Sequence, residues 1–201
     1  MSKNTIISAL NKIVGRRTIP FKFVFSSAMN VNAILTDIKK RKFSVVYLLH
    51  GDESYYIDLI SDALEKEVLN DAQKGFDQTV LYGKDSSIVN IVNAAKRYPM
   101  MSDHQLIIIK EAQDLKWKSE EELLLKYVER PTPTTILVIA YKYGKFDKRK
   151  KIYKAFEKAG TIVESAKLYD NKVGELIVDQ FRASNRLIHP QAAAMMADYL
   201  G

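Results

Sequence analysis

The sequence predicts an α/β fold in which a five-stranded parallel sheet is flanked by helices. Short apolar segments rich in β-branched residues alternate with segments whose apolar residues recur at helical spacing, as in βαβ units. The run from Leu106 to Ile109 is apolar throughout, which is typical of a strand covered on both faces. The expected strands cover residues 43–49, 78–82, 106–109, 135–141 and 161–164.

The helices around these strands are predicted from apolar spacing and from capping residues. Before the first strand, Val31, Ile34 and Ile38 share one helical face, and a run of cations then ends the helix. Three later helices have candidate N-terminal caps. These are Ser86 or Ser87 before Ile88, Ser119 with Glu122 at capping-box spacing, and Asp147 before the basic segment that contains Ile152, Tyr153 and Phe156.

Beyond Tyr169 the strand patterns cease and only helical patterns remain. Val173, Leu176 and Phe181 recur at helical spacing, and a helix rich in alanine and methionine opens at Pro190. We therefore expect the start of a small helical lid domain at residues 169–201, after an α/β domain at residues 29–168. Because the chain stops directly after an apolar helix, we expect it to be a truncated piece of a longer protein.

Composition argues against several classes of protein. With no cysteine among 201 residues there is no disulfide framework and no thiolate zinc site, and the three histidines have no spacing suited to a metal. No serine lies in a G-x-S-x-G elbow, and no apolar run approaches the roughly 20 residues of a membrane helix. The sequence thus predicts no catalytic residue, no metal and no membrane partner. The formal charge of +7 weakly favours an acidic partner such as nucleic acid.

The loop after the first strand lies where a P-loop would hold phosphate, but its residues do not suit that chemistry. A P-loop reads G-x-x-x-x-G-K-[ST]: glycines admit phosphate to the backbone amides, lysine neutralises it and the hydroxyl helps to hold magnesium. Gly51 supplies the first glycine, whereas Tyr56, Ile57 and Asp58 stand at the second glycine, lysine and hydroxyl positions. The alternative interpretation is that Gly51 simply ends a strand and that Tyr55, Tyr56 and Ile57 pack on the sheet.

A second nucleotide element is also incomplete. In an ATPase, a strand like Leu106–Ile109 is followed by Asp and Glu, which serve magnesium binding and water activation. Here Lys110 takes the Asp position and only Glu111 remains. Because a cation cannot bind magnesium, we expect no nucleotide cofactor in this chain.

Two other segments are candidates for binding a partner. The apolar set Tyr98–Met101 is followed at once by polar residues, so it is either an exposed hydrophobic anchor or a turn whose methionines fold back into the core. The segment Lys142–Lys151 is dense in cations and is either a contact for a phosphate backbone or the solvated face of a helix. The candidates for contact with DNA are Lys145, Lys148, Arg149 and Lys150.

Taken together, these segments resemble the delta subunit family of the bacterial DNA polymerase III clamp loader. The resemblance rests on the stretch Val46–Glu53, on Tyr98–Met101 before the third strand, and on the helix end at Tyr127–Pro131 before the next strand. It continues through the cations at 148–151 and covers about residues 29–201. Residues 1–28 fall outside it, and come either from an upstream start codon or from a lineage-specific extension.

The resemblance implies an AAA+-type, P-loop-like fold with a degenerate nucleotide site and a non-catalytic role in the polymerase holoenzyme. Members of the family bind and open the ring-shaped sliding clamp so that it can be placed on primed DNA. They use a short hydrophobic wedge, typically Leu-Phe. Met100 and Met101 stand at that place, with Tyr98 as a further apolar contact, and flexible thioethers suit a hydrophobic pocket. Function is thus expected to have moved from the nucleotide site to a hydrophobic edge nearby.

The implied partners are the beta clamp, the delta prime and gamma/tau loader subunits, and primed DNA within the complex, in a bacterial cytoplasm. The resemblance also implies a C-terminal collar domain, which we expect this chain to lack, and ATP held by neighbouring subunits. Two alternatives stay open. One is a nucleotide-binding or NTPase regulator with an atypical P-loop, and the other is a general DNA-binding domain supported by the charge of +7.

Overall fold

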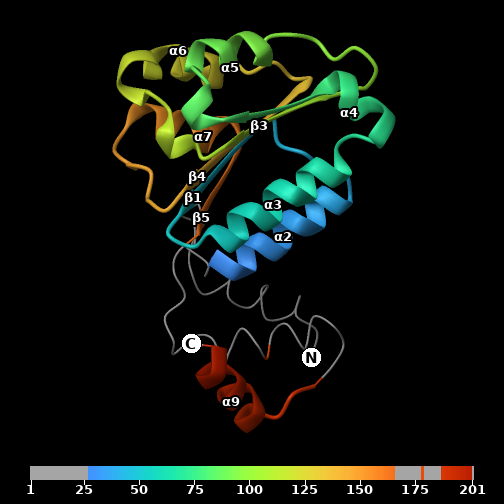
Figure 1. The fold of residues 1–201 in the computed structure, drawn as a ribbon, viewed down its shortest axis with the longest axis vertical. Helices are drawn as coiled ribbons and strands as arrows, with labels where there is room; N and C mark the ends of the chain where they lie inside the picture. Colours follow the sequence, from blue (N-terminus) through green and yellow to red (C-terminus); the bar gives the residue numbers. More distant parts are fainter. Residues whose placement is uncertain (1–26, 166–177, 179–186, 201) are drawn as a thin grey trace, which may run out of the picture.

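The computed structural model describes residues 27–165, 178 and 187–200, and most of these residues lie in or around one sheet (Figure 1). Five parallel strands form this sheet in the order β2-β3-β4-β1-β5, which confirms the predicted fold class. The strands are β1 (Val46–Gly51), β2 (Gln78–Tyr82), β3 (Gln105–Lys110), β4 (Thr135–Lys142) and β5 (Thr161–Ser165).

Helices cover both faces of the sheet. Helices α2 and α3 lie on one face, and α5, α6 and α7 lie on the other (Figure 1). Short 3-10 turns, η1 (Gly83–Asp85) and η2 (Ala112–Asp114), follow β2 and β3. The described α-helices are α2 (Ser27–Lys39), α3 (Ser54–Glu67), α4 (Asp71–Asp77), α5 (Ile88–Ala95), α6 (Trp117–Glu129), α7 (Lys151–Ala159) and α9 (Pro190–Leu200).

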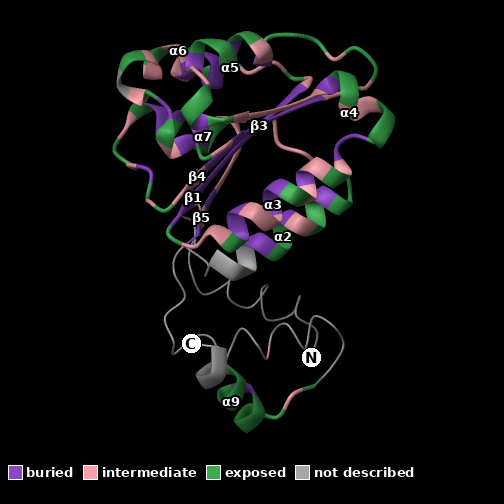
Figure 2. Ribbon diagram, viewed as in Figure 1, coloured by how far each residue is buried: buried purple, intermediate pink, exposed green. Residues whose placement is uncertain are grey.

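The core consists of two layers that share the strands. Because successive side chains of a strand point to opposite faces, β3 supplies Ile107 and Ile109 to the layer under α5–α7, and Leu106 and Ile108 to the layer under α2 and α3. All four side chains are fully buried, and Figure 2 shows the central strands as the most buried part of the molecule. The continuous apolar pattern of β3 follows from this double coverage.

The parallel strands give the sheet two chemically distinct ends. Val46 at the start of β1 lies opposite Leu137 of β4, and Gly51 at its end lies opposite Lys142. The segments that lead into β2 and β3 therefore meet at the amino end of the sheet. The loops that follow β1 and β4 meet at the carboxyl end, where open parallel sheets usually bind their ligands.

One of the three predicted helix caps is confirmed and two are wrong. Ser87 accepts a hydrogen bond from the backbone N–H of Asn90 and caps α5. Helix α6 begins at Trp117, before Ser119, because the Trp117 indole donates to the Ala112 carbonyl oxygen and packs against aromatic rings. Asp147 precedes a turn and accepts hydrogen bonds from Arg149, so α7 begins only at Lys151 and has no side-chain cap.

Two further elements differ from the prediction. The first strand begins at Val46 instead of residue 43, because Phe43 contacts the Arg41 guanidinium and the His104 ring before the chain enters the sheet. Helix α4 was not predicted. Its capping box joins Asn70 and Gln73, a signal that was present in the sequence, but the helix has few apolar residues to show a period.

The predicted helical domain at the end of the chain is described only in part. Helix α9 begins at Pro190, as its sequence predicts. The predicted helix around Val173, Leu176 and Phe181 lies outside the described residues, and so do residues 1–26 of the expected extension 1–28 and the boundary near residue 169. The proposed division into an α/β domain and a lid stays a prediction.

Candidate functional site

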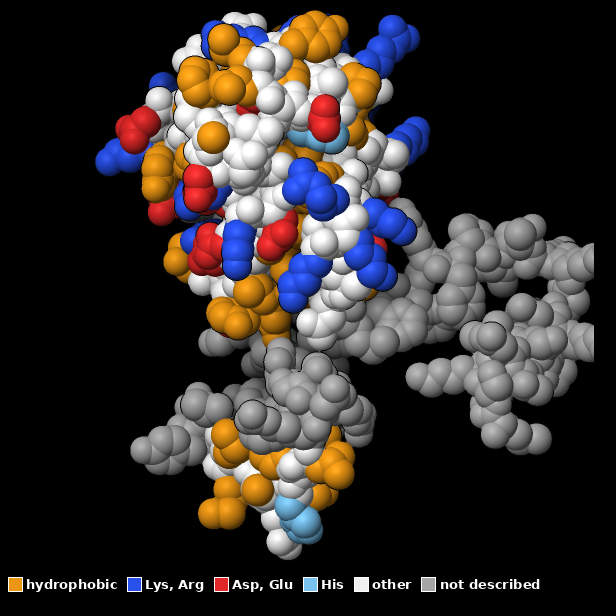
Figure 3. All heavy atoms as spheres, turned by 90° about the vertical axis from the view of Figure 1, so that its right-hand side faces the viewer, with side chains coloured by type: hydrophobic (Ala, Val, Ile, Leu, Met, Phe, Trp, Pro, Cys, Tyr) orange, Lys and Arg blue, Asp and Glu red, His pale blue; other side chains and the backbone are white. Residues whose placement is uncertain are grey.

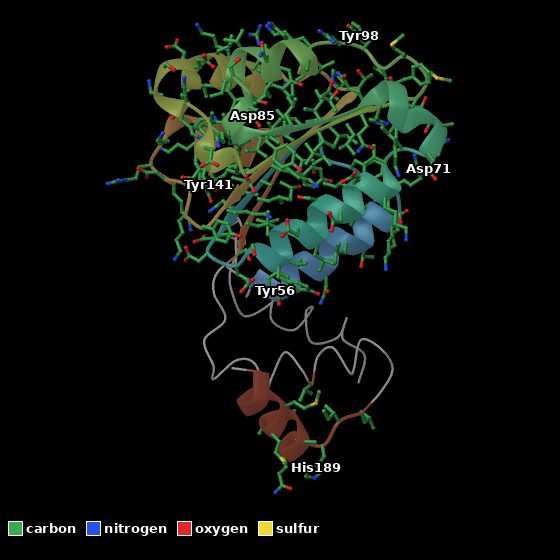
Figure 4. All side chains as sticks on the ribbon, in the orientation of Figure 1. Tyr56, Asp71, Asp85, Tyr98, Tyr141 and His189 are labelled. Carbon is green, nitrogen blue, oxygen red and sulfur yellow. The ribbon has the colours of Figure 1, made fainter. Side chains whose placement is uncertain are left out.

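The two most exposed apolar side chains of the α/β part, Met100 and Tyr98, lie in the segment that leads into β3 at the amino end of the sheet. We call residues 98–104 the methionine loop. The exposed fractions are 77% for Tyr98, 78% for Met100 and 57% for Met101. Figure 4 shows Tyr98 pointing outward from this loop, away from the sheet. Of the two interpretations of the methionines, the structure excludes the one in which they fold back into the core.

The backbone of the methionine loop is fixed by one carboxylate. Asp77 ends α4 and is 4% exposed. Its Oδ1 accepts a hydrogen bond from the Met100 backbone N–H at 2.5 Å, and its Oδ2 accepts one from the Met101 N–H at 2.9 Å. The Ser102 hydroxyl lies 2.7 Å from the same Oδ2. The two methionines therefore have anchored backbones and free side chains.

These hydrogen bonds also set the ionisation of Asp77. Burial raises the pKa of the carboxyl, but the hydrogen bonds from Met100, Ser102 and Met101 stabilise the charged form and outweigh burial. The pKa of Asp77 therefore lies below its ordinary value of 3.8, and the group is an anion at neutral pH.

A second buried side chain fixes both ends of the loop. The Gln105 amide nitrogen lies 2.5 Å from the Arg97 carbonyl oxygen and 2.7 Å from the Thr135 hydroxyl. Through the Arg97 carbonyl it holds the residue just before Tyr98 against the start of β3 and β4. The loop is thus tied to the sheet at its base and to α4 at its centre.

A further exposed aromatic ring lies on α4. Phe76 is 60% exposed and directly precedes Asp77, whose carboxylate contacts the methionine loop. Figure 3, which faces the α4 side, shows several hydrophobic side chains at the top of the molecule, with charged side chains beside and below them. Sequence reasoning missed both Phe76 and Asp77, because it assigned no structure to residues 71–77. We call Phe76, Tyr98, Met100 and Met101 the apolar surface.

At the opposite end of the sheet, Gly51 occupies a position that no other residue could take without strain. Its φ is 143°, and a Cβ atom there would lie 1.8 Å from the Ser165 carbonyl oxygen. The Gly51 carbonyl oxygen accepts a hydrogen bond from Gly144, and the Glu53 N–H donates to Ser165. A glycine is therefore required where the backbones at the ends of β1 and β5 approach closely.

The other residues of the degenerate nucleotide loop are occupied by packing or by ion pairing. Tyr56 and Ile57 are buried against the sheet, whereas Tyr55 is exposed, so its predicted packing is wrong. Asp58 pairs with Lys142 at the end of β4, with 2.6 Å between Oδ1 and Nζ. The hydroxyl position of a P-loop is therefore occupied by a carboxylate, and the Lys142 ammonium is already bound to it.

The second predicted nucleotide element is likewise engaged in internal contacts. Lys110 Nζ lies 3.9 Å from Glu65 Oε2 of α3. Glu111 has a left-handed backbone with φ of 54°, and its carbonyl oxygen lies where a Cβ on Gly83 would be. The two residues therefore serve the packing of α3, η1 and η2 around the end of β3.

The basic segment Lys142–Lys151 is largely neutralised by carboxylates. Each of the predicted candidates for DNA contact has an acidic partner within the described part of the chain. The hydrogen bond from Lys148 holds the pKa of Glu164 below its ordinary value. The pairs are Lys145 with Asp52, Lys148 with Glu164, Arg149 with Asp147, and Lys150 with Glu121.

His50 lies fully buried at the carboxyl end of β1. Its Nδ1 accepts a hydrogen bond from the Phe146 backbone N–H, and its ring packs against Phe146 and Tyr153. Burial lowers the pKa of His50 to about 4, against an ordinary value of 6.5. His50 is therefore neutral and structural at neutral pH. Within the described residues no three acidic or histidine side chains form a metal-binding group.

Two sites predicted as neighbours lie at opposite ends of the sheet. The hydrophobic edge was expected near the nucleotide loop, but Tyr98 and Tyr56 lie at opposite ends of the α/β part (Figure 4). A strand of six residues such as β1 or β3 separates them, a distance of about 20 Å.

In the part of the chain that the structure describes, no helix is long and apolar enough to cross a membrane.

The sheet order and the flanking helices define a P-loop/AAA+-like α/β domain. A family model described as DNA polymerase III, delta subunit, matches residues 47–166. The DNA polymerase III subunit delta of Bacillus subtilis (strain 168) is 25% identical over 163 residues, which make up 78% of this chain and 47% of that protein. Because the family model covers more than half of the sequence, this chain belongs to the DNA polymerase III delta subunit family.

A solved structure shows the same fold. The Bacillus subtilis DNA clamp loader delta protein (YqeN) superposes with a TM-score of 0.73 at 25% identity, over 82% of this chain and 51% of that one. A RuvB protein of Thermotoga maritima is more distant, with a TM-score of 0.47 at 18% identity over 85% of this chain and 54% of that one. The chain spans about half the length of the Bacillus subtilis relatives it matches.

Proposed function

We propose that this chain is the clamp-binding part of a clamp-loader delta subunit, and that it binds and opens the sliding clamp for loading onto primed DNA. The observation that carries the proposal is the apolar surface, in which Met100 and Met101 have anchored backbones and exposed side chains. Large exposed apolar groups on a rigid support suit a hydrophobic pocket on a partner. Membership of the DNA polymerase III delta subunit family supports a partner in the replication machinery.

The chain would act by binding alone, without hydrolysing ATP itself. The P-loop positions hold buried Tyr56 and Ile57, and Asp58 already pairs with Lys142. We propose that ATP is held by neighbouring loader subunits of the gamma/tau type, with delta prime completing the assembly in the cytoplasm. Contact with primed DNA through Lys145, Lys148, Arg149 or Lys150 would require these cations to exchange their present carboxylate partners.

The decisive experiment compares two methionine pairs of this chain. Met100→Ala with Met101→Ala should weaken binding to the organism's sliding clamp by about 100-fold, because two apolar contacts at the centre of an interface contribute roughly 3 kcal/mol together. The matched control is Met195→Ala with Met196→Ala, an exposed pair on α9 that should leave affinity unchanged. Equal affinity of the first variant and the wild type would refute the proposed contact.

Two binding measurements separate this function from its alternatives. Calorimetry with ATP and magnesium should show no binding, and a micromolar affinity would support a nucleotide-binding regulator instead. Titration with DNA at increasing salt should show weak binding at most, since the basic segment is ion-paired. Strong, salt-sensitive DNA binding without affinity for the clamp would support a general DNA-binding domain.

A further inference from the structure

Asp77 is a buried carboxylate whose charge is stabilised by the methionine loop. In the part of the chain that the structure describes, no lysine or arginine forms a salt bridge with it. Both carboxylate oxygens instead face the loop, one toward the Met100 N–H and the other toward the Met101 N–H and the Ser102 hydroxyl. A buried carboxylate is costly unless it is hydrogen-bonded, so Asp77 and the loop stabilise each other.

This arrangement determines which parts of the methionines face solvent. The N–H groups of Met100 and Met101 both point inward to one carboxylate, so the loop backbone is held at two successive residues. The two side chains nevertheless remain more than half exposed. A loop that is ordered before binding loses less conformational entropy when a partner docks, which increases affinity without any new contact.

We infer that Asp77 is a positioning residue, which holds Met100 and Met101 in the conformation that a hydrophobic pocket of the partner accepts. Phe76, the residue before Asp77 on α4, is also exposed. The inference rests on the proposed function for the identity of the partner. The ordering of the loop by Asp77 does not depend on that identity.

The first arm of the test uses this chain alone. Asp77→Asn keeps the size of the side chain but places an amide donor toward groups that are themselves donors. We expect the backbone amides of Met100 and Met101 to exchange with deuterium at least ~10-fold faster in this variant, with little change for amides in β3 and β4. The matched control is Asp71→Asn on the same helix, whose carboxylate pairs with Lys74 at the surface. Unchanged exchange at Met100 and Met101 would overturn the inference.

The second arm measures affinity for the sliding clamp in a double-mutant cycle. Asp77→Asn should weaken binding by ~10-fold in the wild type but far less in a Met101→Ala background, because the carboxylate acts through the methionines. Equal losses in both backgrounds would show a merely structural role and overturn the inference. Ser102→Ala, which removes one donor and is milder, should give an intermediate effect even if Asp77→Asn does not fold.

The two arms distinguish failure of the inference from failure of the proposed function. If the wild-type chain has no affinity for the clamp, the proposed partner is wrong, and amide exchange still decides whether Asp77 orders the loop. If the clamp binds and Met101→Ala weakens binding while Asp77→Asn changes neither exchange nor affinity, the function stands and the positioning role is wrong.

Discussion

The side chains at the carboxyl end of the sheet and those at its amino end make different kinds of contact. At the carboxyl end, charged side chains satisfy one another: Asp58 pairs with Lys142, Asp52 with Lys145, and a glycine is needed for backbone packing. At the amino end, a single carboxylate satisfies the backbone and leaves apolar side chains exposed. The charged groups at the carboxyl end are therefore engaged in internal contacts, whereas the amino end carries the surface that we propose binds a partner.

Under the proposed function, an ATPase-like scaffold keeps its architecture while its binding site changes position. The parallel sheet fixes where each loop emerges, so losing phosphate chemistry at one end leaves the opposite end intact. The exposed apolar surface lies where open parallel sheets do not usually bind small ligands. A surface of exposed rings and thioethers fits a protein partner better than a phosphate.

The largest expected effect on stability is at the carboxyl end. Gly51→Ala should lower the free energy of unfolding by about 4 kcal/mol, because its Cβ would lie 1.8 Å from the Ser165 carbonyl oxygen in a backbone conformation that alanine avoids. Chemical denaturation measures this. Gly75→Ala in α4, where a Cβ meets nothing within 4 Å, is the control and should stabilise by about 0.5–1 kcal/mol. Similar stabilities for both variants would contradict the conclusion that the backbone conformation and close contacts at Gly51 require a glycine.

Acidification should weaken the carboxyl end through His50. The unfolded chain binds a proton near pH 6.5, but the folded chain resists protonation of His50 until about pH 4. The stabilisation from neutral His50 is therefore complete above pH 6.5 and declines as pH falls toward 4, by up to about 3 kcal/mol. Denaturation of wild type and His50→Gln across this range should give a shallower pH dependence for the variant. Parallel curves would show that His50 does not titrate in this way.

Breaking the ion pair beside the degenerate loop should have a smaller effect. Lys142→Met leaves Asp58 without its partner and should cost about 1 kcal/mol, because the pair is only partly buried. Lys126→Met, which breaks a solvent-exposed pair with Glu122, is the control and should be nearly neutral. Neither variant should gain affinity for ATP. An ATP affinity that appears in Lys142→Met would mean that the ion pair alone blocks the nucleotide site.

Substitution of two exposed tyrosines, one at each end of the sheet, should give the smallest difference in affinity. Tyr98 at the amino end and Tyr143 at the carboxyl end have similar exposed fractions, 77% and 72%. Tyr98→Ser should weaken clamp binding by about 5-fold, equivalent to roughly 1 kcal/mol, whereas Tyr143→Ser should leave it unchanged. Surface plasmon resonance with the sliding clamp would measure both. A larger loss for Tyr143→Ser would place the partner at the carboxyl end.

Much of the fold could be predicted because its determinants are local. The apolar run of β3 and the Ser87 cap of α5 are visible within a few residues of sequence. The failed caps at Ser119 and Asp147 show the limit of that approach. At Trp117, packing against Phe146 and Tyr141 determines the start of the helix, and those rings lie far away in the sequence.

The candidate site was predictable in part for the same reason. The apolar segment Tyr98–Met101 and the incomplete P-loop are continuous in sequence, so their residues could be named in advance. Asp77 lies 23 residues from Met100, and Lys142 lies 84 residues from Asp58. No local sequence pattern joins such pairs. Only the folded chain shows that the Asp77 carboxylate holds the methionine loop and that Lys142 pairs with Asp58 in the degenerate nucleotide loop.

The central claim is that the methionines at the amino end form the contact with the clamp, and methyl NMR tests it most directly. The chain contains six methionines, whose labelled methyl groups can be observed separately. On addition of the sliding clamp, we predict that the signals of Met100 and Met101 shift and broaden while those of Met195 and Met196 on α9 stay in place. Unchanged signals from Met100 and Met101 in a chain saturated with clamp would contradict the account.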